Sequence, residues 1–208
     1  MGLLITLEGP DGSGKTCQMD ELEKALKAAG YSVVRSREPG GTPIGEAIRE
    51  VILNPAYTEM DKMTEVLLYA ASRAQHVAEK IKPALESGAI VLLDRFLDSS
   101  LIYQGIGRGL GIETVEAINR FATGGLEPDA TFMVYISYEE GLRRKKKQHE
   151  LDRLEEEKGD FHRLVNEGYK ELAKRYPERI QFIDGARKPE VVHADIMSRV
   201  QQLIKEKL

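Results

Sequence analysis

The sequence has 208 residues, with a single cysteine, no tryptophan and only 6% aromatic residues. One cysteine, Cys17, excludes an intrachain disulfide bond and favours a reducing compartment, here the cytoplasm. No apolar run has the length that spans a bilayer, so we expect no membrane association. Basic residues are not in excess: 30 Lys and Arg stand against 34 Asp and Glu, a net charge of −4. This balance disfavours nucleic acid as a partner, because nucleic-acid-binding proteins are usually basic.

The pattern of apolar runs predicts an α/β fold in a single domain that spans residues 1–208. Strands are predicted at residues 3–7, 31–35, 89–94, 129–137 and 180–184. Helical patterns lie between them, at 16–29, 44–53, 64–87, 113–123, 163–176 and 189–205. Pro83 should kink or split the third of these helices. Strands that alternate with helices predict a five-stranded parallel sheet with helices on both faces.

Residues 9–16 carry the most specific motif, the phosphate-binding pattern G-x-x-x-x-G-K-[ST]. An apolar strand precedes it and a helical pattern follows it, as the motif requires. Its glycines allow the backbone N–H groups to surround anionic oxygens at the start of a helix. Lys15 is placed to reach the terminal phosphates of a bound nucleotide, and Thr16 to offer its hydroxyl to Mg²⁺.

Charged residues follow the other predicted strands, where ligands bind in an open parallel sheet. Asp94 ends the third strand, the usual position of a carboxylate that holds Mg²⁺, directly or through water. Arg95 beside it can bind a phosphate with both arms of its guanidinium. Arg37 and Glu38 follow the second strand, and residues 184–187 follow the fifth. These residues predict a phosphate site at one edge of the sheet.

Two further groups have both a structural and a functional interpretation. Tyr69 and Arg73 share a helix face and are suited to a nucleobase site, although their spacing alone favours a core aromatic beside a solvated arginine. The basic group from Arg143 through Lys147, with Arg153, is typical of a solvated helix face. It also fits a mobile lid, at approximately residues 145–161, that brings cations to a transferring phosphoryl group.

Several motifs together resemble bacterial thymidylate kinases, which are nucleoside-monophosphate kinases of the phosphate-loop class. The matching segments are EGPDGSGKT at 8–16, REPGGT at 37–42, LYAASR at 68–73, DRF at 94–96, DSS at 98–100, YQG at 103–105 and LDR at 151–153. The resemblance runs from the N-terminus into the last predicted helix. It implies the nucleoside-monophosphate kinase fold with a lid, usually as a homodimer.

The resemblance also implies the roles of particular residues. Catalytic roles fall to Lys15, Arg95, Arg153 and Asp11, and Mg²⁺ is expected at Thr16 and Asp94. The co-substrate ATP is expected at Gly9, Pro10, Asp11, Gly12, Ser13, Gly14, Lys15, Thr16, Ala186 and Arg187. The acceptor dTMP is expected at Asp11, Glu38, Pro39, Tyr69, Arg73, Arg95, Ser99, Ser100, Tyr103 and Gln104. Arg95 is implied to bind the acceptor phosphate, Arg73 this phosphate or the thymine edge, and the ring of Tyr69 to stack on the base.

The sequence departs from the family pattern at two positions, with Tyr69 where Phe is more usual and Ile102 where Ala is typical. Ile102 affects access to the sugar only if it faces the pocket. The phosphate loop also contains no arginine, so a cation has to come from elsewhere. We expect it from Arg153, with Arg143, Arg144 and Lys147 as further candidates.

The sequence therefore predicts transfer of a phosphoryl group from ATP to dTMP, giving dTDP for dTTP biosynthesis. An alternative is a kinase for another nucleoside monophosphate or for a nucleoside, which does not account for Tyr69, Arg73 and Tyr103-Gln104 together. A second alternative is a nucleotide-binding switch that hydrolyses GTP. The guanine-recognising Asn-Lys-x-Asp motif of such proteins is not present in the sequence.

Overall fold

Five parallel strands form the central sheet, in the order β2-β3-β1-β4-β5. They are β1 (Leu3–Glu8), β2 (Val33–Arg37), β3 (Ile90–Asp94), β4 (Ala130–Tyr135) and β5 (Ile180–Asp184). The computed structural model describes residues 2–145, 152–157 and 159–208. Each neighbouring pair of strands is parallel, which confirms the sheet predicted from the sequence.

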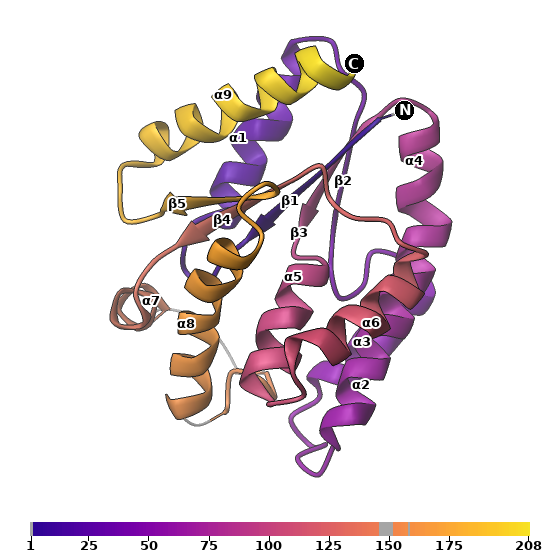
Figure 1. The fold of residues 1–208 in the computed structure, drawn as a ribbon, viewed down its shortest axis with the longest axis vertical. Coiled ribbons are helices and arrows are strands. Elements are labelled where there is room, and N and C mark those ends of the chain that lie inside the picture. The colour runs from indigo at the N-terminus through magenta and orange to yellow at the C-terminus, as the bar shows by residue number, and fades with distance from the viewer. Residues whose placement is uncertain (1, 146–151, 158) are drawn as a thin grey trace.

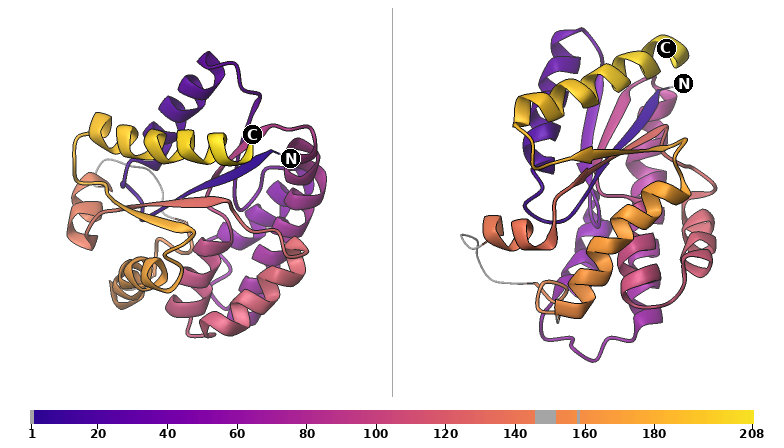
Figure 2. Two further views of the ribbon diagram at one scale, coloured as in Figure 1. Left: turned by 45° about the horizontal axis from the view of Figure 1, so that its top comes forward. Right: turned by 60° about the vertical axis from the view of Figure 1, so that its left-hand side comes forward.

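Helices cover both faces of the sheet (Figure 1). Alternate residues of β1 point to opposite faces, so Leu3, Ile5 and Leu7 pack against α1 and α9 while Leu4 packs into the larger cluster on the other face. Figure 2 shows the two layers from further directions. The helices are α1 (Lys15–Ala28), α2 (Pro43–Leu53), α3 (Lys62–His76), α4 (Lys82–Glu86), α5 (Leu97–Ser100), α6 (Ile112–Thr123), α7 (Tyr138–Lys145), α8 (Gly159–Arg175) and α9 (Pro189–Lys207), with π-helical segments η1 (Val77–Ile81) and η2 (Leu101–Gly107).

Some boundaries differ from the sequence prediction for local reasons. The strand expected at 31–35 runs over Val33–Arg37, because the Tyr31 N–H still bonds to the Leu26 carbonyl at the end of α1. The helix expected at 64–87 is split into α3, η1 and α4, with the π-helical turn directly before Pro83. Proline has no N–H to donate within a helix, so the split confirms the effect expected of it.

The register of the sheet brings functional segments to one edge. Leu7 and Arg37 both pair with Asp94, so β1, β2 and β3 end at the same level. The residues that follow these strands therefore lie close together at the carboxyl edge. In the part of the chain that the structure describes, no helix is long and apolar enough to cross a membrane.

Candidate active site

The loop after β1 has the backbone of a phosphate site. Gly9, Gly12 and Gly14 all have positive φ angles, of 147°, 77° and 96°. A side chain at Gly9 is excluded, because its Cβ would lie 2.1 Å from the Val134 carbonyl oxygen. The Lys15 ammonium donates to the Gly9 carbonyl at 2.8 Å and the Pro10 carbonyl at 3.1 Å, and burial lowers the pKa of Lys15 to about 8. Carbonyl groups of the loop therefore bind the ammonium of Lys15.

A cavity of about 290 Å³ opens beside this loop. It collects residues from separate segments of the sequence, because three strands end at one edge and helices α2, α3 and α8 pack beside it. Of the residues expected from the sequence, it is lined by Asp11, Glu38, Pro39, Tyr69, Arg73, Asp94, Arg95, Ser99, Ser100, Tyr103 and Gln104. The structure thus brings the whole predicted acceptor set together.

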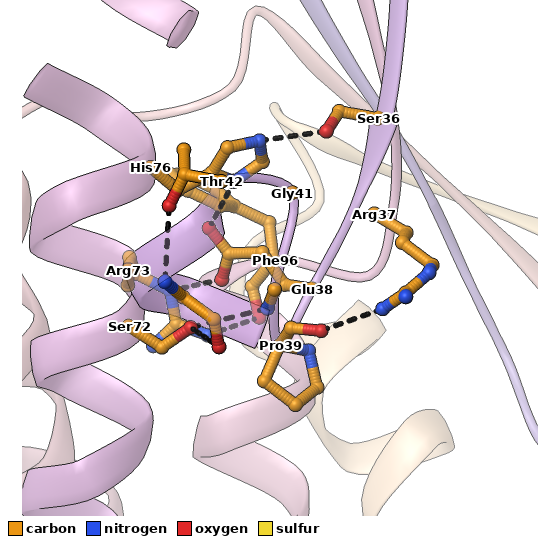
Figure 3. A network of polar contacts seen from close by, with 12 residues as sticks. Ser36, Arg37, Glu38, Pro39, Gly41, Thr42, Ser72, Arg73, His76 and Phe96 are labelled. Carbon is orange, nitrogen blue, oxygen red and sulfur yellow. Dashed lines mark hydrogen bonds and ion pairs between the residues drawn. The ribbon is translucent and has the colours of Figure 1, made fainter. Parts of the chain in front are cut away.

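Glu38 lies at the centre of a buried polar network on the wall of this cavity (Figure 3). Its carboxylate accepts from Arg73 Nε at 2.7 Å and faces His76 Nδ1 at 3.0 Å. The other ring nitrogen of His76 is 2.8 Å from the Ser36 hydroxyl. Sequence analysis predicted Arg73 and Glu38 but gave no role to His76, whose contribution is to hold the Glu38 carboxylate.

The guanidinium of Arg73 is almost fully used by the protein. Besides Glu38, it donates to the Ser100 hydroxyl (3.2 Å), the Asn119 side-chain oxygen (2.5 Å) and the Phe96 carbonyl (3.0 Å). A guanidinium has five N–H groups, so these bonds with described residues leave one N–H toward the cavity. Arg73 is therefore a rigid, buried donor and not a flexible surface cation.

Arg95 connects the cavity to the phosphate loop. Its Nη2 donates to the Asp11 carboxylate at 2.7 Å, and its Nη1 donates to the hydroxyls of Ser99 and Tyr169. The guanidinium also lies 5.4 Å from the centre of the Tyr103 ring. Among the described residues Arg95 alone has a positive φ without being glycine, at 68°. Such a conformation is typical of functional sites.

The sequence predicted Arg153 at the phosphate loop, but the structure places it elsewhere. Arg153 is buried, and it donates to the Ile52 carbonyl at 2.9 Å and to the Glu65 carboxylate at 2.7 Å. These partners occupy its guanidinium on the α2–α3 side of the cavity. The expectation that Arg153 supplies the missing cation of the loop is therefore corrected for this arrangement of the chain.

Arg144 lies at the phosphate loop instead. It donates to the Gly12 carbonyl at 3.1 Å and, more weakly, to the Gly185 carbonyl at 3.4 Å, while Glu140 holds its Nε. Arg143 binds the same carboxylate, but its side chain is 74% exposed and points elsewhere. Lys147 lies outside the described residues. Of the described candidates, Arg144 is thus the cation next to the loop.

The loop after β5 also lies against the phosphate loop. A Cβ at Gly185 would approach the Ser13 carbonyl to 3.1 Å. Ala186 donates its N–H to Asp184, and Arg187 pairs with Asp195 on α9. Ala186 and Arg187 are therefore close to the expected donor site but outside the acceptor cavity.

Both departures from the family pattern have clear positions. Tyr69 is buried and lines the cavity. Ile102 is fully buried in the core, where it lies close to Gly168 of α8. It faces away from the cavity, so it has no direct effect on access to the sugar.

Sequence analysis missed part of the cavity wall. Arg49 of α2 lines it and donates to the Pro39 carbonyl at 2.9 Å, and α8 contributes His162. The described part of the expected lid contributes three more residues, Asp152, Leu154 and Glu155. Apart from Asp152 in the LDR segment, no short motif marks these positions, since their side chains meet only after α2, α8 and the segment before α8 have packed.

A phosphate loop beside a separate, arginine-lined cavity defines a phosphate-loop kinase with an acceptor site. Comparison with known families agrees, since the sequence model of thymidylate kinase matches residues 7–196. The chain belongs to the thymidylate kinase family and is an enzyme, a phosphotransferase.

Relatives cover almost the full length of the chain. Thymidylate kinase of Bacillus licheniformis is 50% identical over 99% of this chain and 98% of its own. That of Thermoanaerobacter pseudethanolicus is 50% identical over 98% and 99%. The crystal structure of thymidylate kinase from Ehrlichia chaffeensis superposes with a TM-score of 0.77 at 31% identity, over 96% of this chain and 98% of that one.

Proposed function

We propose that this chain transfers the γ-phosphoryl group of ATP to dTMP, giving ADP and dTDP. The observation that carries the proposal is the Arg95–Asp11 contact, which joins the acceptor cavity to the phosphate loop. The relatives named thymidylate kinase support dTMP as the acceptor. Transfer is direct and in line, because phosphoryl transfer needs positioning and charge neutralisation rather than a covalent intermediate.

Arg95 and Arg73 divide the recognition of dTMP. Arg95 has a guanidinium at the loop edge of the cavity and is suited to the acceptor phosphate. Arg73 has one N–H left over after its bonds to described residues, which suits a single carbonyl of the thymine ring better than a phosphate. Tyr69 stacks on the base. Glu38 and Pro39, with Ser99, Ser100, Tyr103 and Gln104, complete the wall of the site.

The donor site lies on the phosphate loop, where Lys15 exchanges its carbonyl partners for the ATP phosphates. The hydroxyl of Thr16 and the carboxylate of Asp94 are the hard oxygen donors that Mg²⁺ prefers, so these residues fit the ion. Mg²⁺ supplies charge neutralisation at the transferred phosphoryl group. The loop of Ala186 and Arg187 contacts adenine, with Gly185 against the phosphate loop.

Arg144 supplies the cation that the loop lacks, since its guanidinium is already bonded to Gly12 of the loop. The expected lid, approximately residues 145–161, serves the acceptor rather than the donor in its described part, residues 152–157. Support for this comes from its described part, because Asp152, Leu154 and Glu155 line the cavity. The pair of Arg153 with Glu65 fastens this part to α3.

The enzyme acts as a homodimer in the cytoplasm. Support for the dimer comes from exposed apolar side chains on three packed helices: Ile44 of α2, Leu67 of α3 and Phe121 of α6, the last 92% exposed. A second copy of the chain is the partner that buries such a surface symmetrically. The single cysteine agrees with a reducing compartment.

The acceptor is tested by ADP production with ATP, Mg²⁺ and one acceptor at a time. The panel contains dTMP, dUMP, dCMP, dGMP and thymidine. We expect kcat/KM to be highest for dTMP, because Arg95 suits the acceptor phosphate that thymidine lacks and the remaining N–H of Arg73 suits a thymine carbonyl. A higher kcat/KM for another monophosphate, or for thymidine, would establish the alternative kinase and reject this proposal.

A further inference from the structure

Glu8 is a buried carboxylate directly before the phosphate loop, and the reaction described above gives it no role. It is fully buried at the end of β1. Its Oε1 accepts from the N–H groups of Phe96 (2.8 Å) and Ser99 (3.2 Å), and its Oε2 accepts from the Ser99 hydroxyl at 2.6 Å. All of these donors belong to the segment that follows Arg95.

The backbone of Arg95 is held on both sides by β1. The Arg95 N–H bonds to the Leu7 carbonyl at 3.0 Å, and the next N–H, of Phe96, bonds to the Glu8 carboxylate. Between these two contacts Arg95 has its φ of 68°, a strained conformation for a residue with a side chain. The two contacts with β1 hold this conformation, and Arg95 lines the cavity.

Glu8 also orients the Ser99 hydroxyl. In its ionised form the Glu8 carboxylate only accepts, so Ser99 donates to it, and a lone pair of the Ser99 oxygen is left for Arg95 Nη1 at 3.3 Å. The opposite arm of the guanidinium is held by Asp11, three residues after Glu8. The start of the phosphate loop thus fixes Arg95 through its backbone and through both arms of its side chain.

Burying the Glu8 carboxylate costs free energy, so its presence calls for a reason other than packing. Burial raises the pKa of the Glu8 carboxyl to about 7, with Asp98 of α5 adding to the effect and Arg95, Ser99 and Phe96 opposing it. A buried carboxylate without an ion-pair partner in direct contact is uncommon unless it has a function.

We propose that Glu8 is a positioning residue for the acceptor phosphate: it locks Arg95 and Ser99 in the geometry that binds this phosphate next to the loop that holds ATP. The inference rests on the proposed function in one respect, the assignment of the acceptor phosphate to Arg95. Donor and acceptor phosphates are then aligned by one rigid segment, residues 8–11.

The test compares the affinity for dTMP with the affinity for thymidine, which lacks the phosphate. Their ratio, measured by calorimetry, isolates the phosphate contact. In Glu8→Gln an amide NH₂ replaces one acceptor oxygen; facing the Ser99 hydroxyl, it reverses that hydrogen bond. We expect the dTMP-to-thymidine ratio to fall about tenfold or more, with thymidine affinity unchanged within about twofold. Steady-state KM for ATP should change little.

The control is Thr6→Val on the same strand as Glu8, which removes a buried hydrogen bond to Thr131 of β4 but none of the bonds that Glu8 makes to Phe96 and Ser99. It should leave the ratio unchanged. A folded Glu8→Gln variant with the wild-type ratio overturns the proposal. If that variant shows no cooperative unfolding, Ser99→Ala is measured in its place, and an unchanged ratio there has the same meaning.

Arg95→Met separates this proposal from the proposed function. If Arg95→Met keeps the wild-type ratio of dTMP to thymidine affinity, Arg95 does not bind the acceptor phosphate. The role of Arg95 and the positioning role of Glu8 are then both rejected. If Arg95→Met lowers the ratio and Glu8→Gln does not, only the role of Glu8 is rejected.

Discussion

The guanidinium of Arg153 lies 2.7 Å from the carboxylate of Glu65, and both side chains are buried. Glu65 also accepts from Gln104 at 2.9 Å and from two nitrogens of Arg108. Burial acts against the charge of Glu65, but hydrogen bonds from Arg108, Gln104 and Arg153 hold the pKa of this carboxyl below its ordinary value. One carboxylate thus joins α3, η2 and the segment before α8 around the acceptor cavity.

Glu65→Gln should destabilise the protein by about 3 kcal/mol, because it leaves the buried guanidinium of Arg153 without its counter-charge. The free energy of unfolding is measured in urea. The matched control is Glu23→Gln, which removes solvent-accessible pairs with Lys27 and Arg35 and should cost less than about 1 kcal/mol. Equal losses for the two variants would contradict a structural role for this ion pair.

Arg144→Met should lower kcat by about 10²-fold and leave KM for dTMP within about twofold, because the cation beside the loop acts mainly on the transition state. Steady-state kinetics with ATP and dTMP varied separately measures both effects. Arg143→Met is the control, since Arg143 shares the Glu140 carboxylate but is largely exposed and, among the described residues, bonds to Glu140 and not to the loop. If Arg143→Met reduced kcat as much as Arg144→Met, the assignment of the cation to Arg144 would be wrong.

Gly41→Ala should raise KM for dTMP about tenfold, through the network of Figure 3. Gly41 has a φ of 84°, and a Cβ there would lie 2.6 Å from the His76 ring and 2.7 Å from the Ser36 hydroxyl. The ring has to move, and its hold on Glu38 weakens. Gly30→Ala is the control: it has a similar φ of 90° with open space around it, so it costs only backbone strain of about 1 kcal/mol and leaves KM unchanged. An unaltered KM for dTMP in Gly41→Ala would show that this network does not contribute to dTMP binding.

Part of the acceptor site could be predicted from the position of residues at strand ends, and the rest from the resemblance to a known family. Asp94 and Arg95 follow an apolar strand, and a parallel sheet brings such positions to one edge. Tyr69 and Arg73 are one helical turn apart, and both line the cavity. Sheet topology was sufficient for Arg95, but the spacing of Tyr69 and Arg73 alone favoured a core aromatic beside a solvated arginine. Their role at the acceptor, like that of Ser99, Ser100, Tyr103 and Gln104, was implied by the family resemblance.

The position of Arg153 could not be predicted in the same way. Its partner, Glu65, is 88 residues earlier in the chain, and sequence spacing gives no information on that pairing. A basic run also looks the same whether its side chains face phosphate, solvent or a buried carboxylate. Arg144 and Arg153 both belonged to the predicted cation group, and only tertiary packing distinguishes the one at the phosphate loop.

Stability should depend on pH through Glu8. Burial raises the pKa of its carboxyl from 4.5 to about 7, so between these pH values the folded protein binds more protons at this group than the unfolded chain does. The contribution of Glu8 to the free energy of unfolding therefore falls as the pH rises from 4.5 to 7. Because Glu8→Gln lacks this titration, the stability of the wild type relative to the variant should decrease over that range. Urea unfolding of both proteins at pH 5, 6, 7 and 8 measures the difference. A constant difference would show that Glu8 keeps an ordinary pKa.

Phe121→Glu should convert the proposed dimer into a monomer. Phe121 is 92% exposed on α6, which packs against α3 and its exposed Leu67. A carboxylate placed in the middle of a symmetric apolar interface faces its own copy or apolar side chains, so the dimer dissociation constant should rise about 30-fold or more. Sedimentation across a range of protein concentrations measures this constant. Leu164→Glu on α8 is the matched control, since Leu164 is 45% exposed and lies on a different helix; it should leave the constant unchanged. A wild type that stays monomeric at every concentration would exclude the dimer. A Phe121→Glu variant that associates as tightly as the wild type would show that the subunits meet at another surface.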